Sequence, residues 1–309
     1  MLIRNKQKFW FLALLLILII ASVIYYFTHR SPVTEIDSTP FRDAAGRLIV
    51  STTLFPVYDF AKNVGGDKVS VFLILPAGQE AHAYRPSASD LEKINQSALF
   101  FYTSDLMEPW AQAVVANLSS KTKSLATASG LNDDLDPHVW LDFSKAMIMV
   151  DNISASYQSL DPENAAYYEA SASSYKQKLN DLDVKFATEL KSCRFNKFFS
   201  GGHNTFSYLA KHYNLEYEAA QGYIPDNTLD VPKILSLSKE LKDAGQTHVF
   251  YEELISPYLA ELIRQESGAR KISLNAAHNV GRFAVESGVD FLSLMENNLQ
   301  SLKIGLACQ

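Results

Sequence analysis

The fold is decided by the segment VSVFLILPAGQEAH, residues 69–82, in which an apolar run ends in a Pro-Ala-Gly turn and leads to a histidine. Such a run of β-branched and large apolar residues, closed by turn residues, predicts a buried strand. In an open α/β sheet, ligands bind in the loops at the carboxyl ends of the strands. The segment therefore predicts a strand and places His82 where such a sheet holds a functional side chain.

Similar runs recur on both sides of this segment and alternate with helical patterns. Strands are predicted at residues 48–53, 69–75, 98–102, 197–200, 215–219, 247–251 and 271–274. Alternation of this kind is typical of a mainly parallel sheet flanked by helices. We therefore predict an α/β protein of two similar lobes, an N-terminal lobe (residues 47–160) and a C-terminal lobe (residues 194–309).

A long helix is predicted between the lobes, over residues 161–193. It opens with Asp161-Pro162, an N-cap residue followed by proline, which helix starts prefer. Its apolar side chains recur every three or four residues and so share one face: Tyr168, Ala172, Tyr175, Leu179, Leu182, Phe186 and Leu190. We expect this helix to connect the lobes.

The N-terminal region predicts export from the cytoplasm. Residues 9–27 form an apolar run close to the ~20 residues that cross a bilayer. The basic residues Arg4, Lys6 and Lys8 precede it and should stay inside. We predict an uncleaved anchor within residues 1–30 and a tether over 31–46, which leaves the rest in the periplasm or on the outer face of the membrane. A cleaved signal peptide is the alternative.

Charge and cysteine content restrict the class of protein. The chain carries a net charge of -6, and the part after residue 30 has 24 basic and 34 acidic residues. An acidic protein of this kind argues against nucleic acid as a partner, because phosphate binding depends on Lys and Arg. Cys193 and Cys308 lie in the exported part, where a disulfide would persist. The sequence leaves open whether they pair or remain separate thiols.

Four of the seven histidines occupy equivalent places in this pattern. His203 follows the 197–200 strand through two glycines, and His278 closely follows the 271–274 strand. His138 lies in the segment DPHVW, residues 136–140, where proline stiffens the approach. Together with His82 they predict one shared site at the edge of two sheets. The remaining histidines are interpreted as structural or solvated: His29, His212 and His248.

Four imidazoles indicate zinc as the ligand. Neutral imidazoles bind Zn²⁺ in tetrahedral geometry, and four of them complete its coordination. Calcium and magnesium prefer oxygen ligands, and manganese is suited by carboxylates, so a set of imidazoles favours zinc. Mn²⁺ or another divalent transition metal is the alternative. Carboxylates close in sequence could orient the rings, and the candidates are Glu80, Asp136 and Glu252.

Three motifs resemble the ZnuA/TroA-like family of metal-binding receptors of ABC importers, over nearly everything after residue 47. They are GQEAHAY (residues 78–84), DPHVWLD (136–142) and GHNTF (202–206). Histidine at position 203 resembles the zinc branch, since manganese receptors commonly carry glutamate there. At the fourth ligand position the family usually has aspartate or glutamate, and this chain has His278.

The resemblance implies a function in transport rather than catalysis. A receptor of this kind acts as a monomer, captures metal between its lobes and delivers it to a membrane permease driven by a separate cytoplasmic ATPase. The alternatives are a manganese or iron receptor of the same family, a zinc-dependent hydrolase, which would need an open position on the metal, and a surface adhesin.

Overall fold

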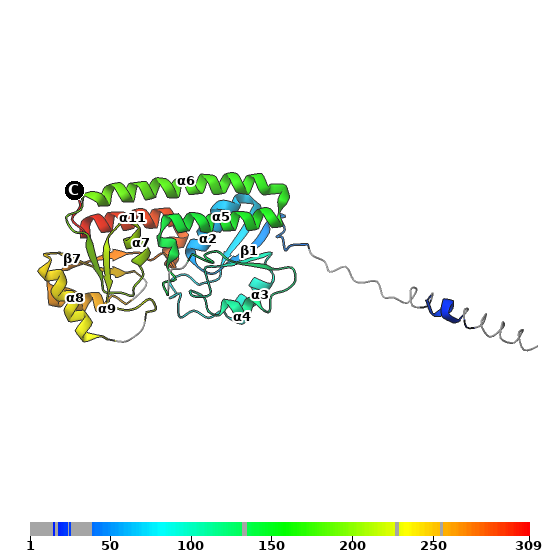
Figure 1. Cartoon of the computed structure of the whole chain (residues 1–309), viewed down its shortest axis with the longest axis horizontal. Coiled ribbons are helices and arrows are strands. Elements are labelled where there is room, and N and C mark those ends of the chain that lie inside the picture. Colours follow the sequence, from blue (N-terminus) through cyan, green and yellow to red (C-terminus); the bar gives the residue numbers. More distant parts are fainter. Residues whose placement is uncertain are drawn as a thin grey trace, which may run out of the picture. The chain divides into compact units, whose positions relative to one another are not determined.

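Two four-stranded parallel sheets form the framework of the protein (Figure 1). The computed structural model describes residues 15, 18–23, 25, 39–131, 135–225, 229–253 and 256–309. The first sheet has the order β2-β1-β3-β4, with β1 Leu48–Thr52, β2 Val69–Leu73, β3 Leu99–Tyr102 and β4 Lys123–Ala126. The second has the order β6-β5-β7-β8, with β5 Lys197–Ser200, β6 Glu216–Ala219, β7 His248–Glu252 and β8 Arg270–Leu274. All these strand pairs are parallel, which confirms the predicted α/β class.

Helices connect and cover the strands. Those between β1 and the long helix are α2 Phe55–Gly65, α3 Ala88–Asn95, α4 Ala111–Val115 and α5 Phe143–Leu160. Those after β5 are α7 Ser207–His212, α8 Val231–Asp243, α9 Tyr258–Ser267, α10 Arg282–Glu286 and α11 Phe291–Gly305. Ser87 caps α3, because its side chain accepts from the backbone N–H of Asp90 in a capping box.

The core lies between the sheets and their helices. Strand β3 is buried along its whole length, as its apolar sequence Leu-Phe-Phe-Tyr indicates for a strand covered on both faces. Four elements were not predicted: β4, α4, α5 and α10. Strand β4 exposes Lys123 and Ser124 and lacks an apolar run, and α5 follows the predicted loop around His138 directly.

The long helix α6, Ala165–Glu189, packs against α5 and α2 on one side of the chain and against α11 near the C-terminus (Figure 1). Its buried residues are Tyr168, Ala172, Tyr175, Leu179, Leu182 and Phe186, all from the predicted apolar stripe. A short 3-10 turn over Pro162–Asn164 precedes it, and the Asp161 carboxylate accepts from Tyr168 and Arg42 instead of capping the helix.

The two cysteines form a disulfide. Cys193 follows the 3-10 turn at the end of α6, and Cys308 follows α11. The bond therefore joins the two ends of the segment that holds the second sheet.

Most of the predicted membrane anchor, residues 9–27, lies outside the described residues. Residues 18–23 are helical, and their side chains are exposed. In the part of the chain that the structure covers, we find no helix with the length and apolar character needed to cross a membrane.

Candidate metal centre

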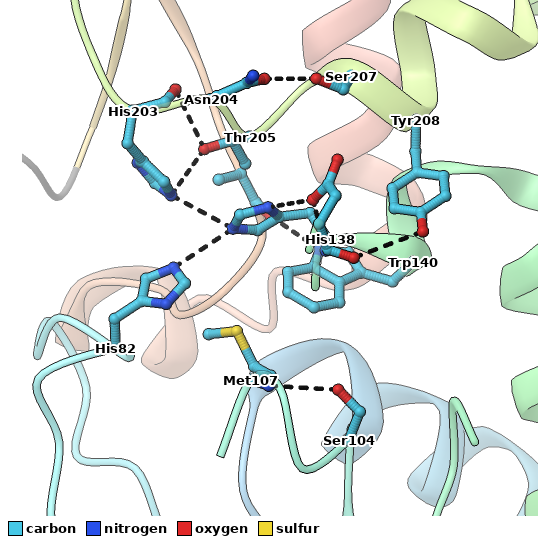
Figure 2. Close-up of polar contacts among 12 residues, drawn as sticks. His82, Ser104, Met107, His138, Trp140, His203, Asn204, Thr205, Ser207 and Tyr208 are labelled. Atoms are coloured by element: carbon cyan, nitrogen blue, oxygen red, sulfur yellow. Dashed lines mark hydrogen bonds and ion pairs between the residues drawn. The ribbon is translucent and has the colours of Figure 1, made fainter. Parts of the chain in front are cut away.

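The structure brings the four predicted histidines together. One side-chain nitrogen from each of His82, His138, His203 and His278 lies within 4.8 Å of the others. Nε2 of His138 is 3.3 Å from Nε2 of His82 and 3.3 Å from Nε2 of His203, and Figure 2 shows these three rings converging. His138 and His203 are fully buried, and His278 is 9% exposed.

The parallel sheets explain this convergence. His82 lies in the loop after β2, His203 in the loop after β5 and His278 in the loop after β8. Carboxyl ends of parallel strands meet at one edge of a sheet, and the two edges face each other at this site. The unpredicted strand β4 leads to His138 in the same way. His203 lies in the loop itself rather than at a helix start, because α7 begins only at Ser207.

The spacing of the imidazoles suits a tetrahedral ion. Zn–N bonds of about 2.0–2.1 Å place two nitrogens of a tetrahedron about 3.3–3.4 Å apart. Both measured Nε2 separations, 3.3 Å, match this value. Nε2 of His278 is buried and has no hydrogen-bond partner among the described residues. No donor among the described residues therefore competes for this nitrogen.

Burial favours the neutral form of three of these imidazoles, those of His82, His138 and His278. Loss of hydration, followed by repulsion from His203, lowers the pKa of His82 to about 3. Burial and the neighbouring imidazoles also hold the pKa values of His138 and His278 well below 6.5. Metal binding requires the unprotonated ring, which is the form that these three imidazoles take at neutral pH.

Asp136 orients the imidazole of His138. Its Oδ1 atom lies 2.7 Å from His138 Nδ1 and also accepts the His138 backbone N–H at 3.0 Å. A proton on Nδ1 directs Nε2 toward the other histidines, as carboxylate partners do in metal sites.

Glu252, at the end of β7, plays a comparable part for His203. Its Oε1 atom accepts the His203 backbone N–H at 3.0 Å and lies 2.8 Å from His203 Nδ1, although that pair is not aligned as a regular hydrogen bond. Glu80 differs from the other two candidates. Its carboxylate accepts the backbone N–H groups of His82 and Ala83, so it holds the main chain of the loop rather than the ring.

Two further contacts were not anticipated. The hydroxyl of Thr205 lies 2.8 Å from Nε2 of His203 (Figure 2). The indole of Trp140 donates to the carbonyl of Ala276 at 2.9 Å. Thr205 and Trp140 both lie within the quoted motifs, but their contacts depend on how the loops meet. A hollow of about 20 Å³, room for one water-sized guest, lies beside His278 between residues 79–81, 252–253 and 275–279.

The other two histidines that the structure describes, His212 and His248, lie apart from the cluster. His212 is placed between Asp142 and Asp183, at 3.1 and 2.9 Å. His248 contacts the hydroxyl of Thr247 at the start of β7. His29 lies outside the described residues.

Comparison with known proteins identifies the family. The family model described as zinc-uptake complex component A, periplasmic, matches residues 50–305. The chain belongs to this family. This zinc-uptake component A family is the one that the three sequence motifs resemble.

Individual relatives agree with the family match. The chain is 30% identical over 291 residues to the zinc-binding protein AdcA of Streptococcus pyogenes serotype M1, covering 84% of this chain and 56% of that protein. It thus spans about half the length of that relative. It is also 29% identical over 281 residues to the high-affinity zinc uptake system protein ZnuA of Bacillus subtilis, covering 84% of this chain and 88% of that protein.

A solved structure has the same fold. The crystal structure of the Zn(II)-bound ZnuA-like domain of Streptococcus pneumoniae AdcA matches with a TM-score of 0.75 and 31% identity, over 84% of this chain and 99% of that domain. The α/β architecture with two parallel sheets is therefore that of a known zinc-bound domain.

Proposed function

We propose that this chain is the extracytoplasmic substrate-binding component of an ABC importer, which captures zinc at His82, His138, His203 and His278 and delivers it to a membrane permease. The observation that carries the proposal is the set of four imidazoles, three of them buried, of which one nitrogen each lies within 4.8 Å of the others. Membership of the zinc-uptake component A family supports it.

The donor set favours zinc over manganese. All four ligands are nitrogen donors, whereas manganese is suited by carboxylate and water. The carboxylates nearby, Asp136 and Glu252, contact the Nδ1 side of the rings rather than offering an oxygen in place of a fourth nitrogen. Zinc is therefore the proposed cargo, and manganese or iron is the competing one.

The same donor set favours a receptor over a hydrolase. A catalytic zinc keeps one position open for water, and a fourth imidazole fills that position. His278 is thus the residue on which the distinction rests. Its Nε2 atom is buried without a hydrogen-bond partner among the described residues, and the centroid of its ring lies 5.3 Å from that of His82 and 4.9 Å from that of His138.

Calorimetric titration of the metal-free full chain with Zn²⁺ and Mn²⁺ tests the proposal. We expect one tight zinc equivalent and much weaker manganese binding. His203→Ala and His278→Ala should each weaken zinc binding sharply, and His248→Ala, which alters a histidine outside the cluster, should not. Unchanged zinc affinity in His278→Ala would remove that residue from the site, and no stoichiometric zinc binding in the wild type would refute the receptor.

We further propose that residues 9–27 anchor the chain to the membrane from which the receptor works. The apolar sequence of that segment and its basic flank support this. The mass of the mature protein and its resistance to alkaline extraction from membranes test it. A mature chain that begins after residue 27 would establish cleavage instead.

A further inference from the structure

The loop that carries His278, residues 275–280, begins in the C-terminal lobe. Asn275 follows β8 directly, and its backbone N–H donates to Oδ1 of Asn298 in α11 at 2.7 Å. The Asn298 amide returns a bond to the Asn275 carbonyl, also at 2.7 Å. The Asn275 side chain donates to Glu253 as well. The start of the His278 loop is therefore fixed to the lobe from which it comes.

Beyond Asn275 the same loop is bonded to the N-terminal lobe. The Ala276 carbonyl accepts from Trp140 at 2.9 Å, the His278 carbonyl from the Phe55 N–H at 3.1 Å, and the Val280 carbonyl from the Gly78 N–H at 3.0 Å. Directly after the first of these bonds Ala277 has φ 57°, a left-handed conformation that residues other than glycine rarely adopt. The loop therefore passes from one lobe to the other between Asn275 and Ala276.

Asn279 makes the most specific of these contacts. It is 1% exposed, and its Nδ2 atom donates to the carbonyls of Pro76 at 2.7 Å and Gln79 at 3.0 Å. Its Oδ1 atom accepts from the Val280 N–H. Pro76 and Gln79 belong to the turn that leads from β2 to His82. One buried amide therefore ties the loop of His82 to the loop of His278.

The main chain around His203, in contrast, is bonded to the C-terminal lobe, from which it comes. In the described part of the chain, the main chain at His203 and Asn204 bonds to its own lobe: the His203 N–H to Glu252, the Asn204 N–H to Gly222 and the His203 carbonyl to Tyr217. The imidazole of His203 reaches the N-terminal lobe through its Nε2 atom, which lies 3.3 Å from Nε2 of His138.

We propose that Asn279 is a positioning residue that fixes His278 beside His82, so that three ligands belong to the N-terminal lobe and His203 alone to the C-terminal lobe. This inference rests on the proposed function. Separation of the lobes would then withdraw one imidazole and leave the metal on His82, His138 and His278. Zinc with three protein ligands has an open position for an incoming ligand, and that position provides a route for handing the metal on.

The test uses Co²⁺ as a spectroscopic substitute for zinc in the full chain. Asn279→Ala should weaken Zn²⁺ and Co²⁺ binding by about 10- to 100-fold, as loss of partners around metal ligands does. The intense visible absorption of tetrahedral Co²⁺ should also fall, because a displaced His278 is replaced by water. The matched control is Asn298→Ala, which releases the same loop from the other lobe and should leave the Co²⁺ spectrum intact.

An unchanged Co²⁺ spectrum and affinity in Asn279→Ala would overturn the inference, as would an equal loss in Asn298→Ala. If Asn279→Ala does not fold, hydrogen exchange of the metal-free wild type decides. The amides of Phe55 and Gly78, which donate to the loop, should exchange as slowly as those of β1, and fast exchange would refute the assignment. Absence of a stoichiometric site in the wild type contradicts the proposed function, whereas a wild-type site insensitive to Asn279→Ala contradicts this inference alone.

Discussion

Four imidazole ligands would leave the charge of a divalent ion uncompensated at this site. Burying an unpaired charge is costly, so nearby anions should be part of such a site. Asp136 and Glu252 meet this need, since each lies within hydrogen-bonding distance of an Nδ1 atom while the Nε2 atoms face one another. A substitution that displaces either carboxylate should therefore weaken metal binding even though the four histidines are unchanged.

Gly202→Ala provides that change. A Cβ at Gly202 would stand 2.3 Å from Oε1 of Glu252, so the carboxylate must move away from His203. We expect zinc affinity to fall by about 10- to 100-fold, measured by competition with a chelator of known affinity. Gly222→Ala is the control, because a Cβ there meets nothing within 4 Å. Equal affinities for Gly202→Ala and wild type would show that Glu252 does not support the site.

At the scale of elements, α6 depends on one apolar face. Its buried side chains contact α2, α5 and α11, whereas the opposite face is solvated. The helix has no side-chain hydrogen bond at its N-cap, so packing rather than capping must stabilise it.

Leu179→Ala tests this dependence. Leu179 is 0% exposed in the middle of α6, and its truncation should lower the free energy of unfolding by about 2–5 kcal/mol. Val184→Ala on the same helix is the control, because Val184 is 58% exposed and should cost less than about 0.5 kcal/mol. Denaturant titration measures both. Similar losses at the two positions would mean that the buried stripe does not stabilise the helix.

At the scale of the whole molecule, His212 links three parts of the chain. It lies on α7, and its ring contacts Asp142 at the start of α5 and Asp183 on α6. The hydrogen bond to Asp142, with the further contribution of Asp183, raises the pKa of His212 to about 9. A raised pKa means that the folded protein holds a proton which the unfolded chain, with a pKa near 6.5, releases first.

Because the pKa of His212 is higher in the folded protein than in the unfolded chain, His212 makes stability depend on pH. The contribution of His212 is fully present below about pH 6.5 and is lost as pH rises through about 9, with a size of about 1–3 kcal/mol after allowance for solvent screening. His212→Gln should therefore be less stable than wild type at about pH 6, and the difference should narrow above pH 9. His248→Gln is the control, since burial lowers the pKa of His248. Thermal midpoints across this range that keep a constant gap for His212→Gln would rule out the charged link.

The disulfide also acts on the whole molecule. Cys193 and Cys308 are separated by 115 positions, a segment that includes the complete second sheet. A cross-link around a loop of about 100 residues removes enough unfolded-chain entropy to stabilise the folded state by about 4–5 kcal/mol in the loop-closure model. The double variant Cys193→Ser, Cys308→Ser should lose stability of this order in denaturant titration. Wild type in reductant should match it, and an unchanged midpoint in both would contradict the prediction.

Local sequence was sufficient to predict the strands that precede His82, His203 and His278, because apolar runs and the turns after them are properties of neighbouring residues. Local sequence also indicated His82, His138, His203 and His278 as candidate ligands, since each lies in a local motif or shortly after a strand. Strand β4 was missed because its four residues are partly exposed and show no apolar run. It is an edge strand, held in the sheet by parallel pairing with β3, and such pairing is not visible in the local sequence.

The path of the chain determined the rest. Asn279 bonds to Pro76 across 203 positions, and Cys193 pairs with Cys308 across 115. The sequence around His212 does not indicate that the carboxylates of Asp142 and Asp183 will lie beside its ring. Hydrogen bonds, ion pairs and disulfides act over a few ångströms, so their partners are defined only after both lobes and α6 have packed. Periodicity along the sequence therefore reveals which residues can serve as ligands, and packing between distant segments determines which of them meet and what holds them in place.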